Sequence, residues 1–186
     1  MSYVDDLIDS YRRFVALPWP RTVAPPQRVW IATYPPKYER RVRLNLQEFR
    51  NATIQSGHPW ECIDITSSFE RWLAGHEYAE AYFEEPELLE TALPAFFDQL
   101  VEEVRGQLKT HNDPIGVVGL LGGGAMFGLG DSVKVSALMD AVNESITGRL
   151  LVFFPGSHEH NNYRLLDARD GWDYLATPIT AEGARR

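Results

Sequence analysis

Three aspartates are the first groups in this chain that could carry out chemistry. Asp64, Asp167 and Asp170 together would supply carboxylate ligands for a divalent metal ion, as a metal-dependent nuclease requires. Such a site also needs a lysine nearby, and Lys37 is the one we expect at the same edge of the predicted sheet. A metal-dependent nuclease therefore stays open as one hypothesis.

Two histidines lie on either side of Glu159. His158 and His160 would point the same way on an extended segment, as metal ligands must. A zinc site needs three or four protein ligands, and neither Cys62 nor the other histidines show ligand spacing around this pair. We expect an exposed loop here and assign no metal ligand.

A glycine-rich stretch, GGGAMFGLGDSVK, follows the third predicted strand. A phosphate-binding loop has the pattern G-x-x-x-x-G-K-[ST]. Gly123 and Gly128 have the required spacing, but Leu129 and Gly130 stand where lysine and serine or threonine should follow. We favour a flexible strand-to-helix turn and assign no cofactor. A degenerate nucleotide-binding sensor that uses residues 122–124 stays open as an alternative.

The chain offers no activated nucleophile. Its serines lack the G-x-S-x-G pattern of a nucleophile elbow. Cys62 falls inside a predicted strand, where a cysteine behaves as a small buried hydrophobic residue. We therefore assign no catalytic residue and expect that the protein is not an enzyme.

The helix predicted after the first strand has a basic outer surface. Its residues are Lys37, Arg40, Arg41, Arg43 and Arg50, and they would suit an acidic partner; Lys37, Arg40 and Arg41 are assigned to the interface. The same residues could instead form a solvated helix face that pairs with the chain's own acids. The formal net charge of −8 argues against unaided nucleic-acid binding, because that attraction is mainly to phosphates.

The segment HEYAEAYFEEPELLE combines aromatic side chains with many glutamates. Tyr82 and Phe83 surrounded by acids fit the pattern of an interface with a charged rim. An amphipathic helix that buries the same rings fits equally well.

A polar connector joins the last two predicted strands. We expect a short helical turn in it, capped by an asparagine, with arginine–aspartate pairs bracing the rest. The connector would then serve as internal bracing, as a contact surface for a partner, or as both. The connector residues assigned to this interface are Asn161, Asn162, Tyr163, Arg164, Asp167, Arg169 and Asp170.

Strands alternate with helices along the chain. Short apolar runs that stop at proline or glycine predict the strands, and apolar residues at helical spacing predict the helices. The strands are expected at residues 28–34, 60–66, 115–121, 150–154 and 172–179, and the helices at 2–16, 36–55, 69–75, 94–108 and 133–146. This alternation predicts an α/β fold: a three-layer sandwich with a mostly parallel central sheet of about five strands, helices on both faces and an N-terminal helix.

Several element boundaries depend on single residues. Ser2 should cap the first helix, and Asp131 or Ser132 should cap the helix over residues 133–146. Residues 155–156, Pro-Gly, should stop the strand before them, and Pro94 should kink or restart a helix opened by an earlier proline.

Length and composition favour one soluble domain over residues 1–186, with residues 1–27 as N-terminal helix and proline-rich link and 181–186 as a frayed tail. One cysteine, Cys62, permits no internal disulfide, which fits a reducing compartment. The sequence has no signal-peptide pattern and no apolar run of the roughly 20 residues that span a bilayer. We expect a cytoplasmic protein.

Four sequence blocks, in order, resemble the BrxB family of BREX bacteriophage-defence systems. They are PWP, QRVWIATYPPKYERRVR, HEYAEAYFEEPELLE, and the closing block in which FFPG is followed by NNYRLLDARDGW, YLA and PIT. The resemblance covers nearly the whole chain. It implies a non-catalytic adaptor that organises other BREX proteins for host-DNA methylation and phage restriction. The implied direct partner is PglZ, with BrxC as second choice and the methyltransferase PglX within a larger complex.

Overall fold

A five-stranded parallel sheet forms the centre of the computed structural model of the protein, which describes residues 2–166 and 171–184. Its strands lie in the order β2 (Trp60–Asp64), β3 (Val117–Leu121), β4 (Arg149–Glu159), β1 (Val29–Tyr34) and β7 (Thr177–Thr180). Three short antiparallel strands extend it: β8 (Gly183–Ala184) pairs with β7, β5 (Asn162–Leu165) with β4, and β6 (Trp172–Asp173) with β5. The predicted α/β fold with a mostly parallel sheet is confirmed.

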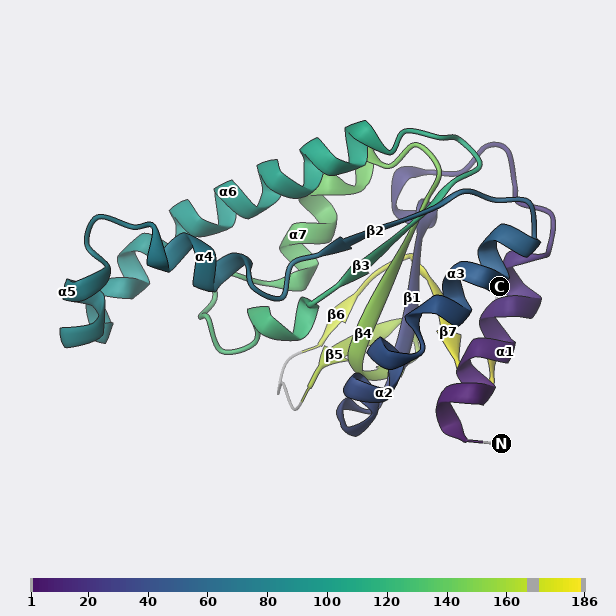
Figure 1. Ribbon diagram of the computed structural model, residues 1–186, viewed down its shortest axis with the longest axis horizontal. Coiled ribbons are helices and arrows are strands. Elements are labelled where there is room, and N and C mark those ends of the chain that lie inside the picture. Colours follow the sequence, from purple (N-terminus) through teal and green to yellow (C-terminus); the bar gives the residue numbers. More distant parts are fainter. Residues whose placement is uncertain (1, 167–170, 185–186) are drawn as a thin grey trace.

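Helices cover both faces of this sheet (Figure 1). The α-helices are α1 (Tyr3–Val15), α2 (Glu39–Leu44), α3 (Leu46–Gln55), α4 (Ser68–Ala74), α5 (Ala79–Glu84), α6 (Leu89–Thr110) and α7 (Val135–Val142). Short 3₁₀-helices lie at η1 (Pro25–Arg28), η2 (Pro36–Tyr38), η3 (Pro86–Leu88), η4 (Gly123–Met126) and η5 (Asn143–Ser145). Helices α1 and α3 pack on one face, and α6 and α7 pack on the other. None of the described helices is long and apolar enough to cross a membrane.

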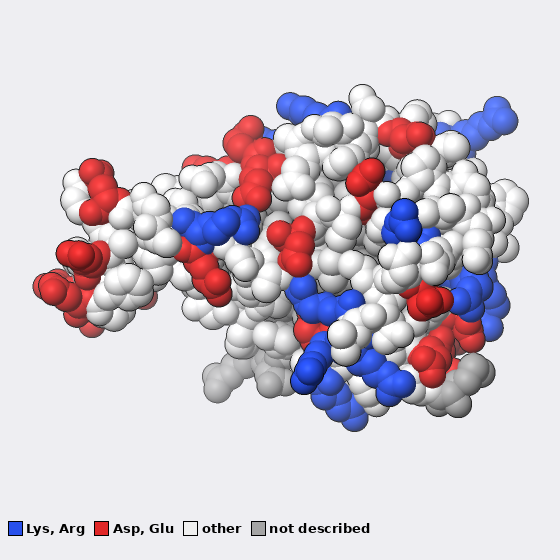
Figure 2. All heavy atoms as spheres, viewed as in Figure 1, with Lys and Arg blue, Asp and Glu red and all other residues white. Residues whose placement is uncertain are grey.

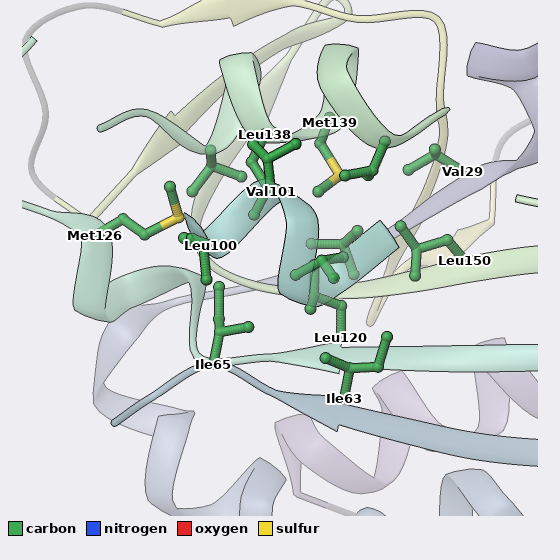
Figure 3. Close-up of a cluster of buried hydrophobic side chains, with 14 of the residues drawn as sticks. Val29, Ile63, Ile65, Leu100, Val101, Leu120, Met126, Leu138, Met139 and Leu150 are labelled. Atoms are coloured by element: carbon green, nitrogen blue, oxygen red, sulfur yellow. The ribbon is translucent and has the colours of Figure 1, made fainter. Parts of the chain in front are cut away.

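Two hydrophobic clusters hold the three layers together. Alternate residues of each central strand point to opposite faces, so Ile31 joins one cluster and Trp30 the other. Leu100 of α6 and Leu138 of α7 pack over Leu120 in the larger cluster (Figure 3). Because both faces of the sheet are covered, its central strands are apolar runs rather than alternating ones.

The first helix begins as the sequence predicts. Ser2 and Asp5 form a capping box: the Asp5 amide donates to the Ser2 hydroxyl at 3.3 Å, and the Ser2 amide donates to the Asp5 carboxylate at 2.8 Å. These hydrogen bonds lower the pKa of Asp5. The cap satisfies amide groups that a helix start leaves without partners.

The predicted continuous helix over residues 36–55 is wrong at Asn45. The Asn45 side-chain amide donates to the Arg41 carbonyl at 2.8 Å, and α2 ends there before α3 begins. Asparagine favours such breaks because its side chain competes for backbone hydrogen bonds.

Two predicted helix boundaries are also wrong. Helix α6 runs through Pro94, so the predicted restart there is wrong; because Pro94 is exposed, the carbonyl that loses its helix hydrogen bond can bond to water. Helix α7 has Lys134 at its N-cap, and neither Asp131 nor Ser132 caps it. Asp131 instead forms an ion pair with Lys134 at 2.9 Å.

Strand β4 does not stop at Pro155. Pro155 is its last residue paired with β1, and the strand then bends so that Gly156 pairs with Leu165 of β5. A Cβ atom at Gly156 would lie 1.9 Å from the Arg164 carbonyl oxygen, so this close approach requires glycine. The proline–glycine pair thus marks a change of partner strand rather than a strand end.

The polar connector starts as a hairpin rather than a helical turn. His160 and Asn161 have φ angles of 48° and 69°, and positive φ at both central residues defines a type I′ turn. The predicted strand over residues 172–179 is likewise divided into β6 and β7. Gly183–Ala184 form β8, within the tail that the sequence predicts to be frayed.

Candidate functional site

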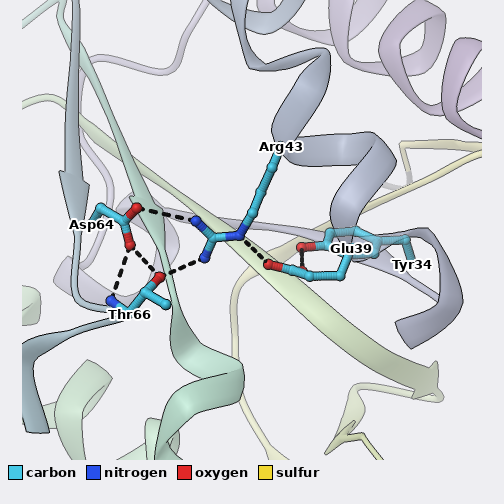
Figure 4. Close-up of polar contacts among 5 residues, drawn as sticks. All are labelled: Tyr34, Glu39, Arg43, Asp64 and Thr66. Carbon is cyan, nitrogen blue, oxygen red and sulfur yellow. Dashed lines mark hydrogen bonds and ion pairs between the residues drawn. The ribbon is translucent and has the colours of Figure 1, made fainter. Parts of the chain in front are cut away.

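Arg43 is the centre of a polar network at the carboxyl ends of β1 and β2 (Figure 4). Its guanidinium donates to Glu39 at 2.6 Å, to Asp64 at 3.1 Å and to the Thr66 hydroxyl at 2.6 Å. The Tyr34 hydroxyl donates to the other oxygen of Glu39 at 2.6 Å. The Thr66 amide donates to Asp64 at 3.0 Å, and the Thr66 hydroxyl also bonds to this carboxylate. The network ties α2 to the end of β2.

The network favours the charged forms of its carboxylate and guanidinium. Burial alone would lower the pKa of Arg43, but its bond to Glu39 and the charge of Asp64 outweigh burial and raise it. Burial alone would raise the pKa of Asp64, but hydrogen bonds from Thr66 and the charge of Arg43 lower it. Asp64 therefore remains an anion at neutral pH, held by protein groups.

This arrangement bears directly on the hypothetical metal site. Both oxygens of Asp64 accept hydrogen bonds from the protein, so a cation would have to displace Arg43. Asp167 and Asp170 lie outside the described residues. Within the described ranges, no three His, Cys, Asp or Glu residues are arranged to hold a metal ion.

Cys62 lies half-buried in β2, next to this network. Burial, together with the charge of Asp64, raises the pKa of the Cys62 thiol to about 11. The thiol is therefore protonated at neutral pH, whereas a reactive cysteine is a thiolate.

The glycine-rich loop after β3 is a tight turn against β2. Gly122 has a φ angle of +95°, and a Cβ atom there would lie 2.4 Å from the Thr66 amide nitrogen. The next residues form η4, which is only four residues long, and α7 begins at Val135. A phosphate-binding loop leads directly into a longer helix, so the observed turn lacks that feature.

A cavity of about 420 Å³ lies at the carboxyl ends of β1 and β7. Thr33, His158, Glu159 and His160 contribute to its lining. Thr33 is buried, and its hydroxyl has no hydrogen-bond partner in the part of the chain that the structure describes. His158 belongs to β4, with its ring 4.5 Å from that of Tyr163, so the expected exposed loop is wrong at His158.

The predicted basic surface exists on α2 and the turn before it, but its assignment is wrong for Arg43, which pairs with Glu39 and Asp64 instead. Lys37, Arg40 and Arg41 are all exposed, and their side chains gather over α2 in Figure 2. The Lys37 ammonium also lies 5.0 Å from the centre of the Tyr38 ring. We call Lys37, Arg40 and Arg41 the basic patch.

Residues 76–90 form a projection that carries acids and exposed apolar side chains (Figures 1 and 2). We call this segment the acidic arm. Phe83 is 71% exposed and Tyr78 57%, so the alternative in which this segment buries its rings is wrong for these two. Tyr82 is half-buried, with its ring 5.1 Å from that of His76. Leu88, also exposed, belongs to the same surface and is absent from the predicted set.

The connector residues divide between surface and core. Asn161 and Arg164 are exposed. The side-chain amide of Asn162 in β5 donates to the carboxylate of Asp173 in β6 at 3.2 Å. Tyr163 is fully buried beside Phe154, so its assignment to the interface is wrong. On a strand that packs one face on the core, every second residue points inward. The predicted interface residues Asp167, Arg169 and Asp170 fall outside the described ranges.

The predicted interface residues therefore do not form one site. The acidic arm lies apart from the basic patch and from the hairpin of β4 and β5 (Figure 1), whereas the hairpin and Pro35, just before the patch, line one cavity. Leu88 could have been predicted as part of the arm's exposed apolar surface, because Glu87 and Glu90 stand close to it in the sequence. Comparison of the chain with protein-family models, curated proteins and solved structures found no match.

Proposed function

We propose that this protein is a non-catalytic adaptor of a BREX phage-defence complex. The observation that carries the adaptor role is the acidic arm, an ordered projection with exposed aromatic and aliphatic side chains. The assignment to BREX rests on the four sequence blocks that resemble the BrxB family. PglZ is the first choice of direct partner and BrxC the second, with PglX in a larger complex.

The outer surface of the acidic arm has the composition of a protein interface. Phe83, Tyr78 and Leu88 supply apolar area, and isolated proteins seldom expose such residues together. Six exposed glutamates belong to the same segment: Glu77, Glu80, Glu84, Glu85, Glu87 and Glu90. An apolar centre within a charged rim is typical of specific interfaces, and this rim favours a partner with a basic surface.

The inner surface of the arm holds it in place. The rings of Trp72 and His76 lie 4.9 Å apart, and Trp72 lies 5.5 Å from Phe96, a buried residue of α6. The Tyr82 ring contacts the His76 ring and so joins this group of packed rings. A preorganised surface binds with a smaller loss of conformational entropy than a mobile one. These contacts support a docking role for the arm.

The basic patch provides a second surface of opposite charge. It lies on α2, away from the arm along the long axis of the molecule. Two surfaces of opposite charge would allow one chain to hold a basic partner and an acidic partner at once. This arrangement supports the proposed role of joining other proteins.

Co-purification tests the proposal. The chain is expressed with PglZ and with BrxC separately, one member of each pair is tagged, and light scattering gives the mass of the product. We expect a stoichiometric complex with wild-type protein and its loss with Phe83→Glu, which places a charge in the apolar centre of the arm. Ile115→Glu, at another exposed apolar residue distant from the arm, is the matched control.

Two results would contradict the adaptor role. One is the absence of a complex with either protein. The other is a complex that Phe83→Glu and Ile115→Glu affect equally, because the arm would then not be the docking surface.

The two alternatives from the sequence have weaker support. The nucleotide sensor depends on residues 122–124, which form a tight turn against Thr66. The nuclease depends on Asp64, whose carboxylate is held by Arg43 and Thr66.

A further inference from the structure

A second cavity, of about 400 Å³, lies at the start of β1 and β4. Its walls come from five places in the chain: the segment around Trp19, the start of β1 with the residues before it, the first residue of β4, Asn161 in the turn after β4, and the segment that leads into β7. Its volume falls within the range of small-ligand sites. This edge of the sheet is opposite to the Arg43 network, so the cavity is a separate place on the molecule.

Arg149 gives this cavity its charge. The side chain is buried, at 6% exposure, and donates to the carbonyls of Gly148 and Pro20, each at 3.0 Å. No described Asp or Glu forms an ion pair with Arg149 or with nearby Arg28. Two carbonyls are neutral partners, and they leave the positive charge uncompensated.

A buried cation without a counter-ion is unfavourable in the empty protein. Burial, and to a smaller extent the charge of Arg28, lower the pKa of Arg149. A guanidinium nevertheless stays protonated in proteins, and it has five N–H groups, of which the two carbonyls engage only part. An anion in the cavity would neutralise the charge and accept the remaining donors.

The walls around Arg149 are mostly apolar. The guanidinium carbon lies 5.1 Å from the ring centre of Trp19 and 6.0 Å from that of Trp30. Val23 adds an aliphatic wall, and Leu175 stands at the rim with 70% of its surface exposed. An occupant of this cavity would therefore combine an anionic group with an apolar body.

The charge count favours a carboxylate over a phosphate. Among the described residues that line the cavity, Arg149 is the one charged residue, so these residues offer a single positive charge. A planar guanidinium matches a planar carboxylate through two parallel hydrogen bonds. Gln27 and Asn161 add neutral amide groups to the lining, but a single positive charge matches a carboxylate monoanion better than a phosphate dianion.

We propose that this cavity binds a carboxylate that carries an apolar side group. The same chemistry belongs to the C-terminus of a polypeptide with an apolar last residue and to a free aliphatic acid. The proposal is independent of the adaptor function, because it concerns neither the acidic arm nor the basic patch.

Matched pairs of ligands test the charge requirement. Titration calorimetry compares acetyl-Gly-Gly-Leu that ends in a free carboxylate with the same peptide that ends in an amide, and isovalerate with isovaleramide. We expect each acid to bind at least about tenfold more tightly than its amide, as for a charge-assisted hydrogen bond. Tighter binding of the peptide acid identifies a protein C-terminus as the ligand, and tighter binding of isovalerate identifies a free acid. Equal affinities of acid and amide, or no binding of any probe, would overturn the proposal.

An isosteric substitution tests the site without disturbing the core. Gln27 is exposed, lines the cavity and accepts a hydrogen bond from the Ala24 amide at 3.0 Å, which a glutamate would also accept. Gln27→Glu therefore adds a negative charge at the wall and should weaken binding of the acids about fivefold or more. Gln99→Glu, on the exposed surface of α6, makes the same change elsewhere and should have no effect.

Arg149→Met removes the proposed anion partner and should abolish the preference for acid over amide. Thermal unfolding first establishes that this variant folds, because Arg149 also holds the Pro20 carbonyl. Where it does not fold, the Gln27→Glu comparison decides. Equal binding by Gln27→Glu and Gln99→Glu would refute the site.

Discussion

At the scale of single residues, two arginines of this protein have opposite surroundings. Arg43 lies among Glu39 and Asp64, which neutralise its charge. Arg149 lies among carbonyls and indole rings, which do not. The first therefore serves as a brace between α2 and β2, and the second leaves a charge for a ligand to neutralise.

The buried hydrogen bond between Tyr11 and Thr53 is the only one described for the Tyr11 hydroxyl, whereas the Thr53 hydroxyl has a second partner. Their hydroxyl groups lie 2.6 Å apart between α1 and α3, and Thr53 also donates to the Phe49 carbonyl at 2.8 Å. Removal of the Tyr11 hydroxyl leaves Thr53 with a partner, whereas removal of the Thr53 hydroxyl leaves Tyr11 with none. The cost of the two changes should therefore differ.

We predict that Thr53→Val lowers the free energy of unfolding by about 1–3 kcal/mol, and Tyr11→Phe by about 1 kcal/mol. The double variant should lose less than the sum of the two, because no buried hydroxyl is then left unsatisfied. Urea unfolding of the four proteins measures this. Equal costs for the single changes, or additive costs, would show that the pair does not act as described.

At the scale of elements, the turn after β3 depends on one glycine. Gly122 combines a φ of +95° with close contact to Thr66, while Gly128 has a φ of +83° and open space around its Cα atom. At both positions the backbone conformation would strain an alanine, but only at Gly122 would the added Cβ atom also clash. They form a natural comparison.

Gly122→Ala should lower the free energy of unfolding by more than about 2 kcal/mol, because strain and a backbone clash add together. Gly128→Ala should lower it by only about 1 kcal/mol, which is the strain alone. Chemical denaturation of both variants beside the wild type is the measurement. Similar losses at both positions would mean that the contact with Thr66 is relieved without cost.

At the scale of the whole molecule, charge is unevenly distributed. The formal net charge is −8, yet acids crowd the arm while Lys37, Arg40 and Arg41 gather over α2. Such separation steers partners of opposite charge to different surfaces. The effect acts through the solvent and is weakened by salt.

For a partner bound at the arm, we predict that Glu84→Lys with Glu87→Lys slows association about tenfold at low salt, because electrostatic steering is lost. The difference from wild type should shrink at high salt. Glu61→Lys with Glu144→Lys changes the net charge equally at exposed sites away from the arm and serves as control. Association rates measured by surface plasmon resonance over a range of salt concentrations provide the comparison. An equal effect of both double variants would indicate net charge rather than the arm.

Short-range patterns in the sequence are sufficient for most of the local elements and for the type of fold. Apolar runs such as residues 150–154 and the capping box of Ser2 specify strands and helix starts through neighbouring residues alone, so the five parallel strands and the N-terminal helix could be predicted. One error of the sequence-based predictions is local, at Asn45, whose own side chain ends α2, and another depends on a distant segment. Pro155 ends a strand in isolation, but here β4 changes its partner from β1 to β5.

Which polar residues are free to act depends on contacts between segments that are far apart in the chain. Asp64 could belong to a metal site in the sequence, but the fold brings Arg43, 21 residues earlier, onto its carboxylate. Tyr163 could be a surface residue, but the hairpin turns it into the core. Nothing near Arg149 in the sequence marks it as part of a binding site. Its surroundings, which contain no described acid, are formed by distant segments such as Pro20, 129 residues earlier, whose carbonyl it bonds. Burial and charge pairing are properties of chain segments brought together by folding, and short-range sequence patterns do not contain them.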